Sequence, residues 1–497
     1  MLTTTECVSF NQVQRGREGC EGMCCMRIPP CPAWVRRFFM QRRAGVDLIT
    51  EDVIMKLTYD INQNPPLKKN LIYAFQQLLA IMAATLLVPI LVDGTGTYMS
   101  QPAALCGAGF GTLFYIFIAT RKKSPVFLGS SFAFISPLAG AVAFGFLGIF
   151  LGAVFAGLVY VIIALIIKKT GSAWVNKLLP PVVIGPTVAL IGLSLCGSAV
   201  NNLNNTAAGS YNLVAILIGV IAFLITVYAS TKGSQGMKLI PFIIGILGAY
   251  VIALILTFIG RAANLEALQL VNLDAFKGMQ LFKVPRFTFL GIFGAYSDAT
   301  NKIGSFADVV SIFVLFAPVA FVTLAEHIAD HKNLSSIINR DLITDPGLDR
   351  TLIGDGVGSI IGSFFGGCPN TTYGESVGCV AITGNASIST IAIAAVYCII
   401  LSFFDPFVCF VNSIPSCIVG GVCIALYGFI AVSGLKMLQP VDLNDNRNLF
   451  VVAAILVTGI GGLTLNFGAV TISSIATGLI LGIIVNVVFN KREGEKA

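Results

Sequence analysis

Long apolar runs separated by short polar stretches dominate the chain from residue 70 onward. Most runs approach the roughly 20 residues that an α-helix needs to cross a bilayer. The apolar residues are continuous rather than alternating with polar ones, which predicts helices and not the strands of a barrel. Fourteen segments are expected, near 70–92, 101–119, 125–138, 141–167, 180–200, 211–230, 239–260, 308–328, 352–366, 373–384, 388–405, 413–435, 448–462 and 467–489.

The basic residues predict how these segments are oriented. Lys and Arg gather in alternate loops, such as 121–123 and 168–177, whereas the short opposite loops, such as "NNLNNTAAG" at 201–209, almost lack them. The exception is the opposite segment 261–307, which has several basic residues but is long and also acidic. Because cytoplasmic loops carry the excess of Lys and Arg, both termini are expected in the cytoplasm of a multi-pass protein. The expected location is the cell membrane, either a plasma membrane or a bacterial inner membrane.

The composition agrees with lipid as the main solvent of the chain. Hydrophobic residues make up 56% and charged residues only 11%, against about 25% charged in a soluble domain. The net charge of +7 lies in the short loops, so it predicts membrane topology and no nucleic-acid partner. The lipid bilayer is the expected surrounding of most of the chain.

The polar stretches divide the chain into parts. The first 54 residues are basic and rich in cysteine but lack an apolar run, so a disordered tail or an upstream extension is expected. These cysteines have no histidine beside them and no paired C-x-x-C repeat, so no metal site is expected. The parts that follow are a leader (55–69), a first half (70–260), an extracytoplasmic connection (261–307), a second half (308–489) and a tail (490–497).

Two short segments occupy equivalent places in the two halves. The third reads "SPVFLGSSFAFISPL" and the tenth reads "CPNTTYGESVGCVAIT", and both are interrupted by Gly, Pro, Ser or Thr. They lie seven segments apart, so two inverted seven-span repeats with short, strand-like breaks are predicted. Paired broken segments of this kind indicate a binding site near the bilayer midplane, which is typical of a transporter.

Acidic residues inside the bilayer are the candidates for chemistry. Glu326 and Asp330 are four residues apart on one helix face, and Glu375 adjoins the tenth-segment break. A charge at the bilayer centre costs at least about 3 kcal/mol, so such residues are functional by default. Two carboxyls that face one cavity can bind a coupling proton. His327 and His331 lie off this face and are interpreted as structural, and Asp355 is expected at a helix terminus.

Four motifs, in order, resemble the nucleobase/ascorbate transporter family, and within it the bacterial uracil permeases. They are "FQQLLAIMAATLLVPILV" (75–92), "LGSSFAFISP" (128–137), the run from "AEHIADH" to "CVAITG" (325–384) and "GGVCIALYGFIAVSGL" (420–435). The resemblance covers about residues 65–490. It implies fourteen spans, a core domain of spans 1–4 and 8–11, a gate domain of spans 5–7 and 12–14, homodimers and proton symport.

The resemblance also implies a binding site. The nucleobase would lie between Glu326 and Glu375, and Asp330 would join Glu326 in proton coupling. Asp330 stands where many uracil permeases have histidine, and Gln77 stands where the family often has histidine. The further contacts it implies are the backbone amides of Phe132 and Gly374, ring packing by Ala84, Phe132 and Tyr373, and a cover from Tyr427.

Uracil is the expected substrate, because two carboxyls and two amides match its two N–H groups and two carbonyls. Family members that transport xanthine or urate usually have glutamine at the position of Glu375. A purine permease of this kind is the first alternative to a uracil permease. The acidic pair argues against an anion transporter. An intramembrane aspartyl protease using Asp330 and Asp355 is a remote alternative. No enzyme activity and no cofactor are expected, and sodium stays open as the coupling ion.

Overall fold

A computed structural model describes residues 57–171, 173–204, 211–297, 301–467 and 471–489. The expected N-terminal extension (1–54) and the C-terminal tail (490–497) lie outside the described residues.

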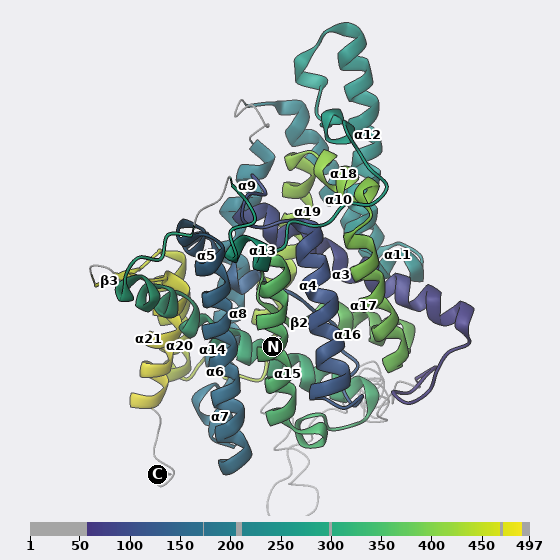
Figure 1. The fold of residues 1–497 in the computed structure, drawn as a ribbon. Coiled ribbons are helices and arrows are strands. Elements are labelled where there is room, and N and C mark those ends of the chain that lie inside the picture. The colour runs from purple at the N-terminus through teal and green to yellow at the C-terminus, as the bar shows by residue number, and fades with distance from the viewer. Residues whose placement is uncertain (1–56, 172, 205–210, 298–300, 468–470, 490–497) are drawn as a thin grey trace, which may run out of the picture. The chain divides into compact units, whose positions relative to one another are not determined.

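The described chain is mostly helical, and its helices follow the apolar segments (Figure 1). The first half contains α3 (Leu67–Val92), α4 (Gln101–Phe114), η1 (Tyr115–Ala119), β1 (Leu128–Ser130), η2 (Phe132–Phe134), α5 (Ile135–Ala141), η3 (Val142–Phe144), α6 (Gly145–Thr170), α7 (Ala173–Leu178), α8 (Pro181–Ser194), α9 (Cys196–Asn204), α10 (Leu213–Thr231), α11 (Gln235–Leu239) and α12 (Pro241–Ala263). The connection contains η4 (Glu266–Leu268), η5 (Leu273–Phe276) and α13 (Thr288–Ile292). The second half contains α14 (Phe306–Ile338), η6 (Ile343–Gly347), α15 (Leu348–Gly366), β2 (Asn370–Thr372), α16 (Gly374–Thr383), α17 (Ile388–Ser402), α18 (Asp405–Ser413), α19 (Ser416–Met437), α20 (Asn446–Ile460), β3 (Leu465–Asn466), β4 (Thr471–Ile472) and α21 (Ser474–Val488).

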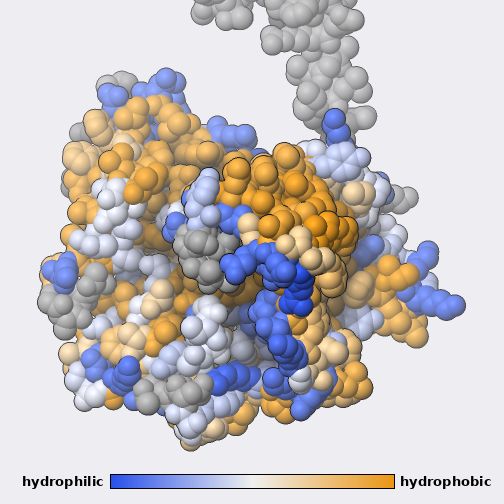
Figure 2. Space-filling view, turned by 90° about the horizontal axis from the view of Figure 1, so that it is seen from above, coloured by the Kyte–Doolittle hydropathy of each residue, from blue (hydrophilic) through white to orange (hydrophobic). Residues whose placement is uncertain are grey.

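The helices have the length and surface of membrane spans. Among the described residues, 8 helical runs are long and apolar enough to cross a bilayer, and α17, α20 and α21 are shorter apolar helices. Large apolar side chains such as Leu224, Ile255 and Val457 are exposed on α10, α12 and α20. Figure 2 shows broad hydrophobic areas on one face of the molecule, separated by hydrophilic stretches. Such a surface is stable in lipid rather than in water.

The helices of residues 57–489 pack in two groups. In the first group α15 lies against α4 and α6, α14 lies against α6, and α17 lies against α3 and α4. In the second group α19 lies against α8, α9 and α10, while α20 lies against α8 and α21. Each group therefore combines helices from both halves of the sequence.

Glycine permits the close helix contacts of the first group. A Cβ on Gly107 of α4 would lie 2.5 Å from the carbonyl oxygen of Gly362 on α15. A Cβ on Gly157 of α6 would lie 2.5 Å from the carbonyl oxygen of Gly356 on the same helix α15. Small residues at such crossings let membrane helices approach until their backbones touch.

The two interrupted segments meet in the interior as a pair of short strands. β1 and β2 are antiparallel, and Leu128, Gly129 and Ser130 oppose Thr372, Thr371 and Asn370. Backbone hydrogen bonds extend the pair at both ends, from Ser131 N to Pro369 O (3.0 Å) and from Tyr373 N to Phe127 O (3.1 Å). Pairing is required because an unsatisfied backbone group is costly inside a bilayer. Helical structure resumes directly after each strand, at Phe132 and at Gly374.

Candidate functional site

A cavity of about 560 Å³ lies where the two broken segments meet α14. The opposite wall includes Phe429 of α19, from the second packing group, and Phe242 of α12, which packs against α10 and α19 of that group. Lys238 and Lys436 line the same cavity. Six of the eight residues singled out in the sequence line it, namely Phe132, Glu326, Asp330, Tyr373, Gly374 and Glu375.

Three carboxyl groups surround this cavity. Glu326 and Asp330 are separated by one turn of α14, and Glu375 is the second residue of α16. All three side chains are partly exposed, so water in the cavity reaches them. The hydroxyl of Thr372 donates to Asp330 Oδ2 (2.9 Å), which ties α14 to the end of β2. The cavity therefore offers acceptors to a ligand with N–H groups.

Two helix starts add backbone donors to the same cavity. Phe132 is the first residue of η2 and Gly374 is the first residue of α16. The first N–H groups of a helix have no partner within it, and they carry the positive end of the helix dipole. Backbone donors and carboxyl acceptors thus line one space, which suits a neutral polar ligand.

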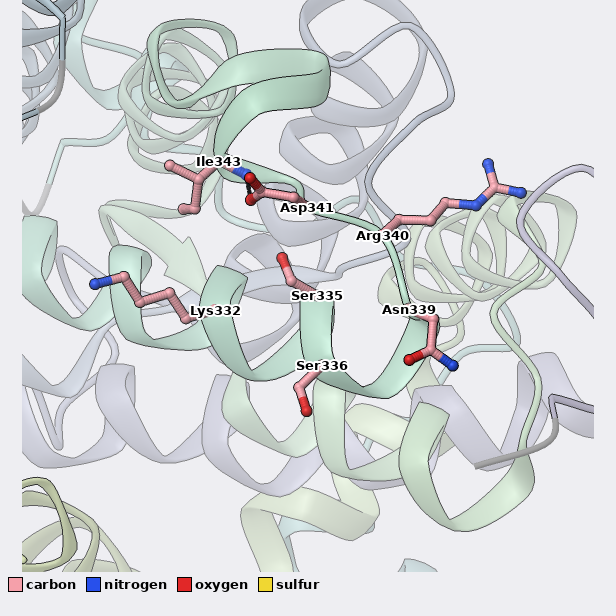
Figure 3. Close-up of a pocket in the computed structure, with 7 residues that line it drawn as sticks. All are labelled: Lys332, Ser335, Ser336, Asn339, Arg340, Asp341 and Ile343. Carbon is pink, nitrogen blue, oxygen red and sulfur yellow. Dashed lines mark hydrogen bonds between the residues drawn. The ribbon is translucent and has the colours of Figure 1, made fainter. Parts of the chain in front are cut away.

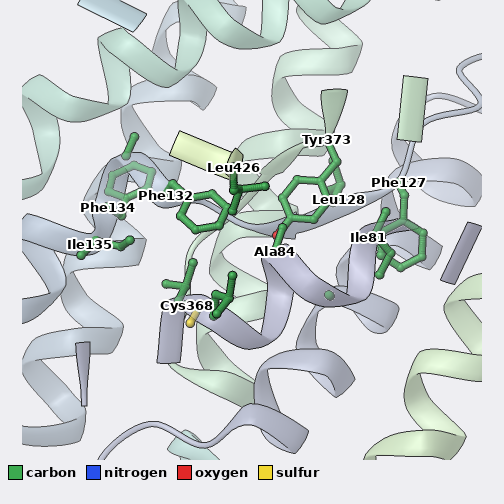
Figure 4. Packing of buried hydrophobic residues seen from close by; sticks show 14 of the residues in the cluster. Ile81, Ala84, Phe127, Leu128, Phe132, Phe134, Ile135, Cys368, Tyr373 and Leu426 are labelled. Atoms are coloured by element: carbon green, nitrogen blue, oxygen red, sulfur yellow. The ribbon is translucent and has the colours of Figure 1, made fainter. Parts of the chain in front are cut away.

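Ala84 and Tyr427 lie behind the cavity wall rather than in it. Each is only 1% exposed, and neither is among the lining residues. The ring of Tyr427 packs edge-on against Phe132, with 5.9 Å between ring centroids. Ala84 belongs with Tyr373 to one cluster of buried hydrophobic residues (Figure 4). Both residues therefore support the aromatic side chains that line the cavity.

Gln77 has a role that its position in the sequence did not reveal. Its side-chain amide Nε2 donates to Ser376 Oγ. The backbone N–H of Phe127, just before β1, donates to the same Ser376 oxygen (3.1 Å). All three groups are buried. The link joins α3 to the residue that follows Glu375 and thereby orients the first turn of α16.

The expectation for Asp355 is wrong. Asp355 lies inside α15 rather than at its end, and it is 0% exposed. Its Oδ2 is 2.8 Å from Nδ1 of His327, which is equally buried. The predicted segment began four residues too late, at 352 instead of Leu348. The small residues of "GDGVGSIIG" signal close helix packing, and from them burial of Asp355 could have been predicted.

A second cavity, of about 410 Å³, lies at the C-terminal end of α14 and contains none of the candidate residues (Figure 3). Arg340 beside it forms an ion pair with Asp60 of the leader. No group of three or more His, Cys, Asp or Glu in the described part of the chain could hold a metal ion. The acidic cavity between the broken segments is therefore the candidate site.

Helices long and apolar enough to span a membrane, with a polar cavity beside two broken segments, are typical of a multi-pass membrane transporter. The sequence matches the model described as "Permease family" over residues 68–467. The chain belongs to this permease family, as its motifs predicted.

Relatives in this family align with this chain along nearly their whole length. A uracil permease of Bacillus caldolyticus is 38% identical over 441 residues, which is 88% of this chain and 96% of the relative. A uracil permease of Bacillus subtilis is 37% identical, covering 86% and 93%. One from Escherichia coli is 32% identical over 433 residues, covering 86% and 93%. These relatives are permeases, so the chain is a transporter and not an enzyme.

Solved structures of other transporters have a similar fold. The transmembrane domain of the cyanobacterial bicarbonate transporter BicA aligns with a TM-score of 0.55 at 14% identity, covering 85% of this chain and 97% of that one. The murine anion transporter Slc26a9 in its inward-facing state aligns with a TM-score of 0.59 at 11% identity, covering 97% and 74%. At such identities the likeness concerns the fold alone.

Proposed function

We propose that this protein imports uracil by proton symport through alternating access. The observation that carries the proposal is the cavity in which Glu326 and Glu375 face one space together with two helix starts. The relatives named uracil permeases, 32% to 38% identical, support the same substrate.

In the proposed complex the carboxyls of Glu326 and Glu375 bind the uracil N–H groups. The backbone amides of Phe132 and Gly374 donate to its carbonyls. A site built to pair each polar group rejects ligands that leave a buried group unpaired. Tyr373 and Phe132 pack against the ring, and Ala84 and Tyr427 act from behind by holding these two rings in place.

The coupling proton is proposed to bind the pair Glu326 and Asp330. A negative charge is costly to move through the bilayer interior, so protonation lowers the cost of moving the loaded site. The hydrogen bond from Thr372 to Asp330 links this pair to β2, one residue before Tyr373. Release of uracil and of the proton on the cytoplasmic side completes the cycle. The coupling ion is proposed to be H⁺ rather than Na⁺.

Alternating access is proposed to follow from the two packing groups. The first acts as the core domain with the site, and the second acts as the gate domain. The proposed topology has fourteen spans in two inverted repeats, with both termini cytoplasmic and two chains in a homodimer. Lys238 and Lys436 line the cavity and lie in the last turns of α11 and α19, at ends that the positive-inside rule assigns to the cytoplasm. The described conformation is accordingly proposed to open inward.

Uptake of radiolabelled uracil into cells lacking their own permease tests this function. We expect uptake that a protonophore abolishes and that unlabelled uracil, but not xanthine or adenine, competes away. Competition by xanthine instead would favour the purine alternative. Uptake that survives the protonophore but requires sodium would contradict proton coupling.

A further inference from the structure

A buried polar cluster lies on the face of α14 that turns away from the cavity. His327 and His331 stack with their ring centroids 4.1 Å apart. His327 contacts Asp355 and Thr351 of α15, and His331 contacts Tyr115 of η1. All five side chains are at most 1% exposed. Neither substrate binding nor the proposed coupling pair uses this cluster.

The contacts of His331 define one neutral form of its ring. Its Nδ1 is 2.8 Å from the carbonyl oxygen of His327, and a carbonyl only accepts, so Nδ1 carries a hydrogen. Its Nε2 faces two hydroxyls, those of Tyr115 at 2.7 Å and Ser124 at 3.3 Å. The Tyr115 hydroxyl is also 3.0 Å from Ser124 Oγ. If Ser124 donates to Tyr115 and Tyr115 donates to Nε2, the two hydroxyl hydrogens serve the two shorter contacts and the ring stays neutral. No additional proton is needed at His331.

The contacts of His327 require one proton more. Its Nε2 is 3.0 Å from the hydroxyl of Thr351, and that hydroxyl donates to the carbonyl oxygen of Leu348 (3.2 Å). Because a hydroxyl has a single hydrogen, Nε2 must then be the donor to Thr351. The contact between Nδ1 and Asp355 Oδ2, at 2.8 Å, needs a second hydrogen. The Asp355–His327 pair therefore holds a proton that makes it neutral overall.

Loss of this proton requires only one small rearrangement. If Thr351 turns its hydroxyl hydrogen from Leu348 to Nε2, a neutral His327 still donates from Nδ1 to an ionised Asp355. The pair then carries one negative charge in the protein interior, which is costly unless it is compensated. Both protonation states thus keep the contacts of His327 Nδ1 and Nε2 and of Asp355 Oδ2, but their net charges differ by one.

The pair is linked to the cavity through two elements. His327 follows Glu326 directly on α14. Asp355 lies against the backbone N–H of Thr372, whose hydroxyl donates to Asp330. The titratable groups near the pair are Glu326, Asp330 and His331 of α14, Tyr160 of α6 and Tyr115 of η1.

We propose that the Asp355–His327 pair is a second proton-binding site of this carrier, separate from the carboxyls that face the cavity. The proton comes from the cavity water that Glu326 and Asp330 contact, and it returns there when the pair ionises. Proton binding at the pair does not depend on the substrate. A contribution of the pair to coupling rests on the function proposed above.

The chain has only 2 histidines, which makes a direct test possible. The purified full-length protein is labelled with ¹⁵N-histidine, and its imidazole nitrogens are followed by NMR from about pH 5 to pH 8, where an ordinary imidazole titrates. The variant His331→Gln lacks the His331 signals and so shows which set belongs to His327. We expect the His331 signals to stay those of a neutral ring with hydrogen on Nδ1. The His327 signals should change with pH as the pair loses its proton.

Two variants separate this proposal from a purely structural role. Asp355→Asn leaves an amide oxygen that accepts from Nδ1, so the pH-dependent change at His327 should be lost. Tyr115→Phe removes a partner of His331 only and should leave the change at His327 intact. His327 signals that do not vary with pH in the wild type would overturn the proposal, and this result needs no variant.

Uracil affinity measured on the same sample distinguishes the two hypotheses. Titration of His327 without uracil binding would overturn the proposed function and leave the proton site standing. Uracil binding with a pH-invariant His327 would overturn the proton site alone.

Discussion

Replacement of Glu375 by glutamine tests the binding site with the smallest change in shape. Glu375 lies in the first turn of α16 and lines the cavity. Glutamine keeps the length of the side chain but removes the charge, and one of its two polar atoms becomes a donor. That donor would face a uracil N–H group, so one hydrogen bond to a charged acceptor is lost.

The expected loss of affinity follows from the value of such a bond. A hydrogen bond to a charged group contributes about 1.5–3 kcal/mol, which corresponds to a roughly 10- to 150-fold higher Kd for uracil. The measurement is equilibrium binding of radiolabelled uracil to the purified protein. Glu266→Gln is the matched control, because Glu266 is exposed in the connection between the two halves. An unchanged Kd in Glu375→Gln would refute the assignment of Glu375 as a uracil acceptor.

Three further predictions follow from the site and its supports. Glu326→Gln mimics the protonated acid, so uracil exchange across the membrane should persist while proton-driven accumulation is lost. Accumulation equal to that of the wild type would contradict the role of Glu326 in coupling. Tyr427→Ala removes the ring that packs on Phe132 and should destabilise the protein by about 3–5 kcal/mol, measured as thermal unfolding in detergent. Tyr427→Phe keeps the ring and should keep the affinity for uracil. Gly107→Val places a side chain against the backbone of Gly362 and should lower the stability of the protein by about 1–3 kcal/mol. A variant as stable as wild type would show that the contact between α4 and α15 is looser than described.

The apolar pattern predicted the helices and both interruptions because each depends on local composition. Apolar runs have to be helical in lipid, and Gly and Pro clusters end them. The spacing of Glu326 and Asp330 predicted a shared helix face for the same reason, and both residues line the cavity.

Contacts between distant segments could not be predicted in this way. Hydrophobic periodicity does not specify which helices are neighbours, so the hydrogen bond of Gln77 to Ser376 and the pair of His327 with Asp355 left no local signal. Ala84 and Tyr427 illustrate a related limit. The resemblance places both against the ligand, which stays a prediction, and no local pattern indicated that both are buried and that Tyr427 packs against Phe132.

Protons are proposed to drive uracil through the cavity between Glu326 and Glu375. The most direct measurement is uptake of radiolabelled uracil by the purified protein in liposomes, with an imposed pH gradient as the only energy source. We expect accumulation above equilibrium that collapses when the gradient is removed and that is absent in Glu326→Gln. Accumulation to the same level without a pH gradient, or in Glu326→Gln, would contradict it.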